Sequence, residues 1–414
     1  MADLTEPRFL SRTSPPHILT LVMLAGLSAL AMNVFLPSLP KMTTYFQTDY
    51  AVMQLSVSAY LALNGVLQLV IGPLSDRYGR RPVILWGIVV FCLATVGCLL
   101  STSIEMFLFF RMIQTSVSVG LVLSRAIVRD MVPADQAASM IGYVTMGMSL
   151  VPMIAPAIGG FLDELYGWQA NFAILLFLGV LTWGLIWADL GETNTHQSAS
   201  FAAQFADYPE LFGSRRFWGY CLTAALAAGA FFAFLGGAPF VATNHYNLSA
   251  SALGLYFGFV SLGYLLGNFL SGRYSTRVGI NLMMQTGSVV ALCGLAFCLL
   301  LLLSGFDHPI WFFGAMLAVG IGNGMVLPNA NAGMVSVRPH LAGTASGLGG
   351  AILLLGGASL AALAGALLTK ESGPYPLLAV MITVTVLSLA MIRYIIRVER
   401  QSGPLEPPKH RPPA

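Results

Sequence analysis

The feature that most constrains this chain is a series of long apolar stretches that lack charged side chains. Residues 217–272 contain no Asp, Glu, Lys or Arg, and neither do residues 50–75 or 136–162. A helix that crosses the hydrocarbon core of a membrane needs about 20 apolar residues. Only 9% of the residues are charged, whereas a soluble domain carries about 25%. The chain is therefore predicted to use lipid as its solvent.

These stretches predict an all-α membrane protein with twelve transmembrane helices, six on each side of a polar segment. Residues 217–272 are long enough for two helices, with Pro239 and the run Thr243-Asn244-His245 expected to mark the hairpin between them. The predicted spans are 18–40, 50–75, 82–104, 106–124, 136–162, 165–188, two within 217–272, 278–306, 309–337, 341–369 and 372–392. The predicted units are an N-terminal tail (1–16), a six-helix bundle (17–188), a linker (189–215), a second six-helix bundle (216–397) and a C-terminal tail (398–414).

The distribution of basic residues predicts the orientation. With twelve spans both termini lie on one side, which receives 17 Lys and Arg residues, against Lys41 and Lys370 on the other side. Basic residues collect in the cytoplasmic loops of membrane proteins. Both termini and the linker are therefore predicted to be cytoplasmic.

Two segments match each other at an offset of 200 residues. Such an internal match is expected when a transporter is built from a duplicated six-helix unit. The two bundles are therefore expected to be pseudo-symmetric. The matching residues are Gly72, Ser75, Arg77 and Gly79 in the first half and Gly272, Ser275, Arg277 and Gly279 in the second.

Several function classes are disfavoured by composition and by the lack of motifs. A net charge of +3 without a continuous basic stripe excludes nucleic acid as a partner. The five cysteines lie in apolar runs, the six histidines are scattered, and neither a zinc-binding pair nor a phosphate loop is present in the sequence. An enzyme is therefore not expected, and neither a metal nor a cofactor is predicted.

The loop after the second span carries the most specific motif, Gly72-Pro73-Leu74-Ser75-Asp76-Arg77-Tyr78-Gly79-Arg80-Arg81. It resembles the loop signature of the major facilitator superfamily. Further segments resemble the Bcr/CflA branch of drug/proton antiporters, and the likeness covers nearly the whole chain. These segments are Phe35-Leu36-Pro37, Ser124-Arg125-Ala126-Ile127-Val128-Arg129-Asp130, Gly167-Trp168-Gln169-Ala170-Asn171-Phe172 and Gly343-Thr344-Ala345-Ser346.

This resemblance implies two bundles around a central cavity that opens alternately to either side. It implies that the loop after the second span acts as a conformational switch, in which Asp76 pairs with arginines or faces a helix N-terminus. Gly72 and Gly79 are expected to permit a close approach and a turn. The alternative is that this basic loop only sets the topology. The predicted switch residues are Gly72, Asp76, Arg77, Gly79, Arg80 and Arg81.

Arg111 is the only charge deep within a predicted span, and such a costly charge is a functional hypothesis by default. With Gln114 it resembles an antiporter signature of helix four that is linked to proton transfer, although Thr115 replaces the usual glycine. The alternative is that Arg111 extends towards the membrane surface, because Glu105 lies only six positions earlier.

Span five resembles the antiporter signature of helix five, with Val151 and Ala155 in place of its two leading glycines. Small residues let helices approach closely, and proline imposes a bend. Ordinary packing is an equally simple explanation of these residues. The matching positions are Pro152, Pro156, Gly159 and Gly160.

The main departure from the family lies in span one, where Asn33 replaces the aspartate that this branch usually has. Asparagine can hydrogen-bond a ligand, but it cannot take up a proton. Proton coupling then depends on an acid near a span end or is absent. The candidate acids are Asp76, Asp130, Asp163 and Glu164.

By the same resemblance, spans one, four, seven and ten line the cavity. Aromatic side chains give adaptable apolar contacts, and a few amides orient the ligand. Because the cavity lacks an acid, neutral or anionic substrates are favoured over cations; the alternative is that the aromatics face lipid or pack between helices. The predicted cavity residues are Asn33, Phe35, Arg111, Gln114, Tyr220, Phe231, Phe232, Phe234, Asn323 and Asn329, with Met146 and Met148 from span five.

The sequence thus predicts a monomeric secondary transporter of a bacterial inner membrane, surrounded by lipid and driven by a proton gradient. It is expected to export small amphipathic drugs or metabolites as an antiporter. The alternative in the same class is a proton-independent metabolite uniporter. A polytopic receptor or membrane enzyme is a remote alternative, because the sequence lacks long extramembrane loops and clusters of catalytic residues.

Overall fold

The computed structural model describes residues 9–12, 16–131, 140, 144, 151–194, 208–338 and 341–402. Within these residues the regular structure is helical, and eleven helices are long and apolar enough to cross a membrane. The predicted fold class is confirmed. The fifth predicted span lies partly outside the described residues, and its visible part is the helix α9 (Val151–Tyr166).

The first half contains five of these eleven helices besides α9. Three of them are interrupted: the first consists of α1, η1 and α2, the second of α3 and α4, and the fourth of α6, η2 and α7. The elements of this half are α1 (Ile18–Asn33), η1 (Leu36–Ser38), α2 (Leu39–Tyr45), α3 (Tyr50–Met53), α4 (Leu55–Tyr78), α5 (Arg80–Leu99), α6 (Ile104–Ile113), η2 (Gln114–Val117), α7 (Ser118–Met131), α9 and α10 (Gln169–Asp189).

The second half contains six long helices, preceded by a short helix that lies within the predicted linker. Pro239 does not mark the hairpin as expected: it lies inside α13, because transmembrane helices tolerate proline where their neighbours satisfy the freed carbonyls. The elements are α12 (Tyr208–Phe212), α13 (Arg215–Asn244), α14 (Ala250–Val278), α15 (Ile280–Leu303), α16 (Pro309–Ser336), α17 (Ala342–Leu367) and α18 (Tyr375–Ser402).

Backbone geometry supports the internal repeat. Gly79 and Gly279 have φ of 93° and 85°, and each N–H donates to the carbonyl of the serine four residues earlier. Gln47 and Asn247, which have φ of 49° and 53°, are likewise 200 residues apart. Because left-handed backbone is uncommon outside glycine, two such pairs at one offset indicate that both halves share one design.

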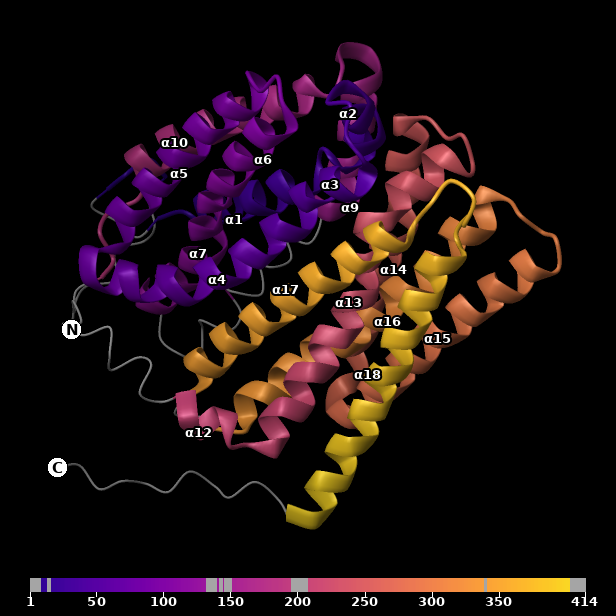
Figure 1. Ribbon diagram of the computed structural model, residues 1–414. Coiled ribbons are helices and arrows are strands. Elements are labelled where there is room, and N and C mark those ends of the chain that lie inside the picture. The colour runs from indigo at the N-terminus through magenta and orange to yellow at the C-terminus, as the bar shows by residue number, and fades with distance from the viewer. Residues whose placement is uncertain are drawn as a thin grey trace.

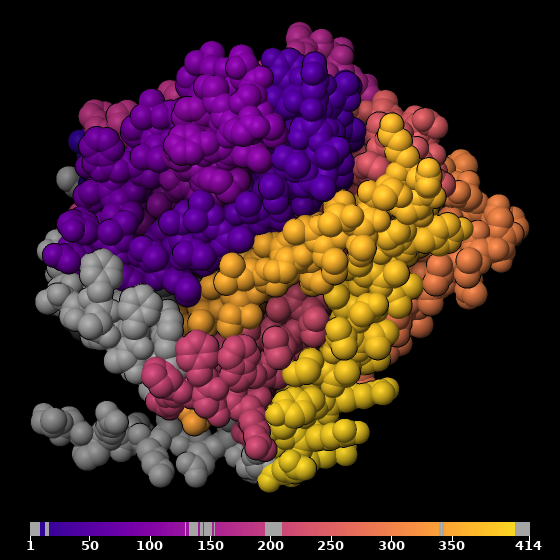
Figure 2. Space-filling view, in the orientation of Figure 1, coloured from indigo at the N-terminus to yellow at the C-terminus, as the bar shows by residue number. Residues whose placement is uncertain are grey.

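Helix ends gather on two sides of the molecule. We call the side with the loops at 79, 279 and 337–341 the terminal side, because α1 begins and α18 ends on it; Figure 1 shows α12 and the end of α18 at the bottom of the view. We call the side with the loops at 46–49, 245–249 and 368–374 the distal side. The halves meet mainly through two helix pairs, α9 with α14 and α4 with α17. In Figure 2 the surface of α17 lies directly against the indigo surface of the first half.

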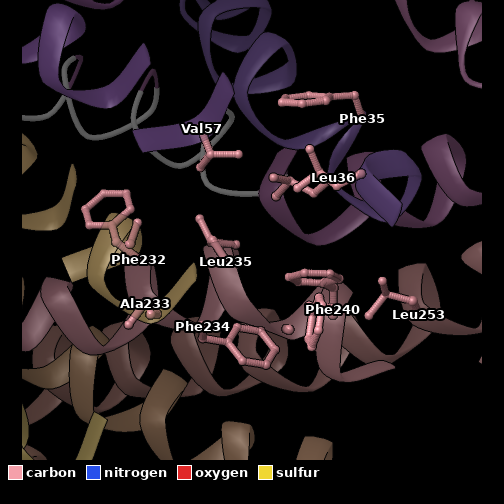
Figure 3. Packing of buried hydrophobic residues seen from close by; sticks show 14 of the residues in the cluster. Phe35, Leu36, Val57, Phe232, Ala233, Phe234, Leu235, Phe240 and Leu253 are labelled. Carbon is pink, nitrogen blue, oxygen red and sulfur yellow. The ribbon is translucent and has the colours of Figure 1, made fainter. Parts of the chain in front are cut away.

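The apolar core differs between the two sides. On the distal side one cluster contains residues of both halves, and Figure 3 shows Leu36 and Val57 facing Leu235 and Phe240. On the terminal side the core is divided: one cluster around Ile84 and Leu123 belongs to the first half, and another around Met284 and Ile395 belongs to the second. The two halves are therefore joined by apolar packing on the distal side, whereas each has its own core on the terminal side.

Candidate functional site

Arg111 occupies the interior of the first half and is fully buried. Its guanidinium donates to the carbonyl of Ser56 on α4 at 3.2 Å, to the carbonyl of Ala31 on α1 at 2.9 Å, and to Oε1 of Gln114. Arg111 therefore does not extend to the membrane surface. It ties together three helices through neutral acceptors.

Two aromatic rings enclose the same guanidinium. Its central carbon lies 4.4 Å from the ring centre of Phe35 and 3.9 Å from that of Tyr60, distances typical of cation–π contacts. The described residues form no salt bridge with Arg111. The structure thus brings together Phe35, Arg111 and Gln114, and adds Tyr60, which sequence analysis missed.

The backbone of helix four changes at the position where threonine replaces the family's glycine. Residues Gln114–Val117 form a 3-10 turn between α6 and α7, and the Thr115 hydroxyl donates to the carbonyl of Met112 at 2.6 Å. The Gln114 amide also donates to the Thr95 hydroxyl on α5 at 2.8 Å. This turn directs Gln114 towards both Arg111 and α5.

Asn33 is the last residue of α1 and is 3% exposed. Its amide donates to the carbonyl of Ala29, one turn earlier in the same helix, at 2.7 Å. Asn33 therefore lies two residues after Ala31, the acceptor of Arg111, but its own amide is bonded within α1.

The predicted switch loop is built around Arg80 on the terminal side. Its guanidinium pairs with Asp76 at 2.5 Å and with Asp130 on α7 at 3.1 Å. Gly79 supplies the left-handed residue between α4 and α5, a conformation that strains other residues. The Arg77 guanidinium lies over the Tyr78 ring. At Gly72 an added Cβ would meet no atom within 4 Å, so the expected close approach occurs at Gly79 alone.

Glu192, which follows α10, contacts this loop, although the sequence places it in the predicted linker (189–215). Its carboxylate accepts the backbone N–H groups of Arg80 at 2.8 Å and Arg81 at 3.2 Å. It therefore caps the N-terminus of α5, where Gly79 offers no side chain. A Cβ at Gly79 would press against this carboxylate. The only signal in the sequence is an acid at the start of a cytoplasmic linker.

The prolines and glycines of α9 lie where helices approach most closely. An added Cβ would collide with the Val34 carbonyl at Gly159 and with the Ala250 carbonyl at Gly160. The carbonyl of Pro152 accepts the hydroxyl of Ser261 at 3.3 Å. These residues thus allow α9 to pack against both α1 and α14.

We call the contact between α9 and α14 the α9–α14 seal, formed by Pro156, Gly160, Glu164, Ala250 and Gly254. A Cβ at Gly254 would collide with the carbonyl of Pro156, so the two backbones touch. Glu164 accepts the N–H of Ser251 at 3.0 Å, in the first turn of α14. Hydrogen bonds from Ser249 and Ser251 lower the pKa of Glu164, which lies beyond the predicted span 136–162.

We call the second distal contact the α4–α17 seal. It is formed by Tyr50 of α3, Gln54 at the N-cap of α4, Gly236 of α13, and Ala361 and Gly365 of α17. The Tyr50 hydroxyl donates to the carbonyl of Gly236 on α13 at 2.6 Å. Gln54 is fully buried, and an added Cβ at Gly236 or Gly365 would press against it. Neither polar atom of its amide has a hydrogen-bond partner in the described residues. Sequence analysis missed both seals.

The cavity residues predicted in the second half lie apart from one another. Tyr220 donates to Glu399 on α18 at 2.5 Å, and Asn281 of α15 donates to the same carboxylate. Phe231 packs on Phe232, with ring centres 5.8 Å apart.

Three further predicted positions lie deeper in this half. Phe234 packs between Phe257 and Phe313. Asn329 donates to the Ser271 hydroxyl at 2.8 Å, and Asn323 lines a small, mostly apolar cavity inside the bundle. Met146 and Met148 lie outside the described residues. The structure thus brings together predicted residues of the first half and separates those of the second.

Comparison with known proteins places these features in a family. The sequence model of the Major Facilitator Superfamily matches residues 21–361. The chain is 31% identical to an uncharacterized MFS-type transporter, YdgK, of Bacillus subtilis, over 89% of this chain and 92% of the relative. It is 30% identical to multidrug resistance protein D of Escherichia coli, over 94% and 98% respectively.

Solved structures agree on the fold. A bacterial homolog of the human lysosomal transporter Spinster, in an inward-facing and occupied conformation, superposes with a TM-score of 0.70 at 17% identity, covering 92% of this chain and 96% of that one. The human organic anion transporter MFSD10 superposes with a TM-score of 0.68 at 19% identity, covering 91% and 98%. These relatives are multi-pass membrane transporters, not enzymes. The chain belongs to the major facilitator superfamily, within the drug-resistance branch that its motifs resemble.

Proposed function

We propose that this transporter exports small amphipathic compounds by alternating access, in exchange for protons. The observation that carries the proposal is the division of the core. Apolar packing joins the halves on the distal side, while separate cores on the terminal side leave the halves able to part there. This arrangement is expected of a transporter whose cavity opens to the terminal side in one of two states.

The substrate class is supported by the names of relatives and by the charges of the site. One relative, 29% identical over 79% of both chains, is a chloramphenicol resistance protein of Pseudomonas aeruginosa. In the first half, Asn33 replaces an acid and Arg111 is enclosed by its own bundle. We therefore propose neutral or anionic amphipathic substrates rather than cations.

Proton exchange requires an acid that can bind and release a proton. Of the acids considered as carriers, Asp76 and Asp130 pair with Arg80, Asp163 pairs with Lys41 at 2.8 Å, and Glu164 caps α14. Asn33 cannot carry a proton. This observation favours a second candidate, a proton-independent facilitator.

We further propose that the protein is a monomer in a bacterial inner membrane, with the terminal side in the cytoplasm. The excess of arginines at the helix ends of that side supports this orientation.

Transport assays in proteoliposomes test both candidates. Initial rates for chloramphenicol and for a lipophilic quaternary ammonium cation are compared with and without a pH gradient, in wild type and Asn33→Asp. A carboxylate at position 33 binds and releases a proton and offers a partner for a cation. We expect Asn33→Asp to become more dependent on the gradient and to transport the cation better.

Asn268→Asp is the matched control, because the Asn268 amide also donates to a carbonyl one turn earlier, that of Tyr264. We expect this variant to keep the wild-type dependence. A wild-type rate that does not respond to the gradient would favour the facilitator. A wild type that prefers the cation and depends steeply on the gradient would show that another acid couples transport.

A further inference from the structure

The outer surface of the first half carries a groove of about 660 Å³ between α4 and α5. Its floor is the interrupted fourth helix, at Met112, Ser116 and Val119. Trp86 forms part of the wall and is 69% exposed. Since the surrounding solvent at these helices is lipid, the groove opens towards the acyl chains of the membrane.

The groove is long enough for one lipid chain. Along α4 its lining recurs from Leu63 to Tyr78 at helical spacing. These positions span about 22 Å at 1.5 Å per residue. One leaflet of the hydrocarbon core is about 15 Å thick, half of the whole. A chain that enters at Tyr78 therefore reaches the middle of the membrane before the groove ends near Leu63 and Met112.

The mouth of the groove lies at a basic edge of the terminal side. Tyr78 and Pro82 line it there, and the Arg77 guanidinium lies 5.4 Å from the Tyr78 ring centre. The Arg81 guanidinium, held by the carbonyl of Leu190 at 2.8 Å, belongs to the same loop. Basic edges beside transmembrane helices attract anionic headgroups.

We propose that the groove binds one acyl chain of an anionic phospholipid, with its phosphate at the Arg77–Tyr78 edge. The bound lipid then contacts the residues on both sides of Gly79, so that the composition of the membrane acts directly on the loop between α4 and α5. Substrate chemistry and proton coupling play no part in this proposal.

Native mass spectrometry of the full chain tests it. The protein is extracted from vesicles of phosphatidylglycerol and phosphatidylcholine in equal amounts, and the retained lipid is identified. We expect wild type to keep one phosphatidylglycerol. Val83→Trp, which fills the groove, should lose it, whereas Leu93→Trp should keep it, because Leu93 lies on the same helix, is 67% exposed and does not line the groove.

A second pair of variants covers the case in which Val83→Trp fails to fold. Trp86→Ala removes a wall of the groove, and Phe177→Ala removes an aromatic ring of similar exposure, 66%, on α10. Only the first should weaken retention. Arg77→Gln should keep a lipid but lower the preference for phosphatidylglycerol about fivefold, the effect of one basic residue at a membrane surface.

Three results would overturn the proposal. One is a folded wild type that retains no lipid. Another is equal retention by the two members of either matched pair. The third is retention of both lipids in their bulk ratio, which would show that the groove does not distinguish one headgroup from the other. Displacement of the lipid by a transported compound would assign the groove to substrate instead.

Discussion

The two distal seals are copies of one contact, and they are built from different chemistry. The internal repeat relates α4 to α14, and α9 to α17, so that the α4–α17 seal and the α9–α14 seal exchange places under the repeat. At the offset of 200 residues, Gln54 corresponds to Gly254. One seal therefore closes by contact of two backbones, and the other by insertion of a large polar side chain.

This difference has an energetic consequence. Gly254 lets α14 touch α9 without leaving a polar side chain buried there. Gln54 is buried with both amide atoms unpartnered in the described residues, a condition that costs about 1–3 kcal/mol for each unmet group. When the α4–α17 seal opens, water or ligand can satisfy that amide. Closure is thus favoured at one seal and opposed in part at its copy.

The largest expected effect comes from Gly254→Leu, which forces a side chain between α14 and the carbonyl of Pro156. Overpacking at a site that cannot move costs about 3 kcal/mol, so the distal side should open and transport should fall to background. Pulsed EPR distances between labels at Asp49 and Lys370 report the opening. Gly258→Leu is the control, because an added Cβ at Gly258 meets no atom within 4 Å. Equal distances in the two variants would refute the backbone-contact view of this seal.

Gln54→Leu should act in the opposite direction. Removing two unpartnered polar atoms should stabilise the distal-closed state by about 1–3 kcal/mol for each atom removed. We expect a higher melting temperature together with slower transport. Gln68→Leu, on the same helix, removes an amide that has a partner in Asn64 and should not raise the melting temperature. A lower melting temperature for Gln54→Leu would mean that its amide is satisfied after all.

Tyr50→Phe tests the remaining hydrogen bond of the α4–α17 seal. Loss of the bond to Gly236 should destabilise the closed state by about 0.5–1.5 kcal/mol, seen as a smaller fraction of the short EPR distance. Tyr60→Phe removes a hydroxyl that has no partner in the described residues. No loss of closure is expected for Tyr60→Phe. If both variants behave alike, the Tyr50 hydroxyl does not hold the seal.

The smallest effect concerns pH and should appear only at the α9–α14 seal. Hydrogen bonds from Ser249 and Ser251 lower the pKa of Glu164 in the closed state. Glu164 therefore contributes fully to the stability of the closed seal above the ordinary pKa of a carboxyl group. This contribution is lost as the pH falls through the lowered pKa of Glu164 in the closed state. We expect a slight opening of this seal at acid pH, measured between labels at Tyr166, where α9 ends, and Asn247, in the loop before α14. Glu164→Gln should abolish that response, and an unchanged response would assign it to another group.

Much of the fold was predictable because its causes are local in sequence. Charge-free stretches mark the spans, and a glycine that must adopt positive φ marks the loop at Gly79. The neighbours of Arg111 were not predictable, because its acceptors are backbone carbonyls at Ala31 and Ser56, which any residue type supplies. Glu192 was missed because its role depends on where α10 ends.

The cavity residues of the second half were hard to predict for another physical reason. Helices such as α13 and α16 are apolar on all faces, so that periodicity does not indicate which face meets a cavity. Phe234 and Asn329 consequently turn towards neighbouring helices, Phe234 against Phe257 and Asn329 against Ser271.

The enclosure of Arg111 has a consequence for biogenesis. An arginine in the middle of a nascent transmembrane segment raises the free energy of insertion by about 2.5–3.5 kcal/mol. Its acceptors at Ala31 and Ser56 and its aromatic neighbours Phe35 and Tyr60 all precede it in the chain. When this segment leaves the ribosome, the helices that receive the arginine have already been synthesised. Synthesis from the N-terminus thus makes the acceptors of Arg111 before Arg111 itself. In a permuted gene that placed α1 and α4 last, Arg111 would have to enter the membrane before these acceptors existed.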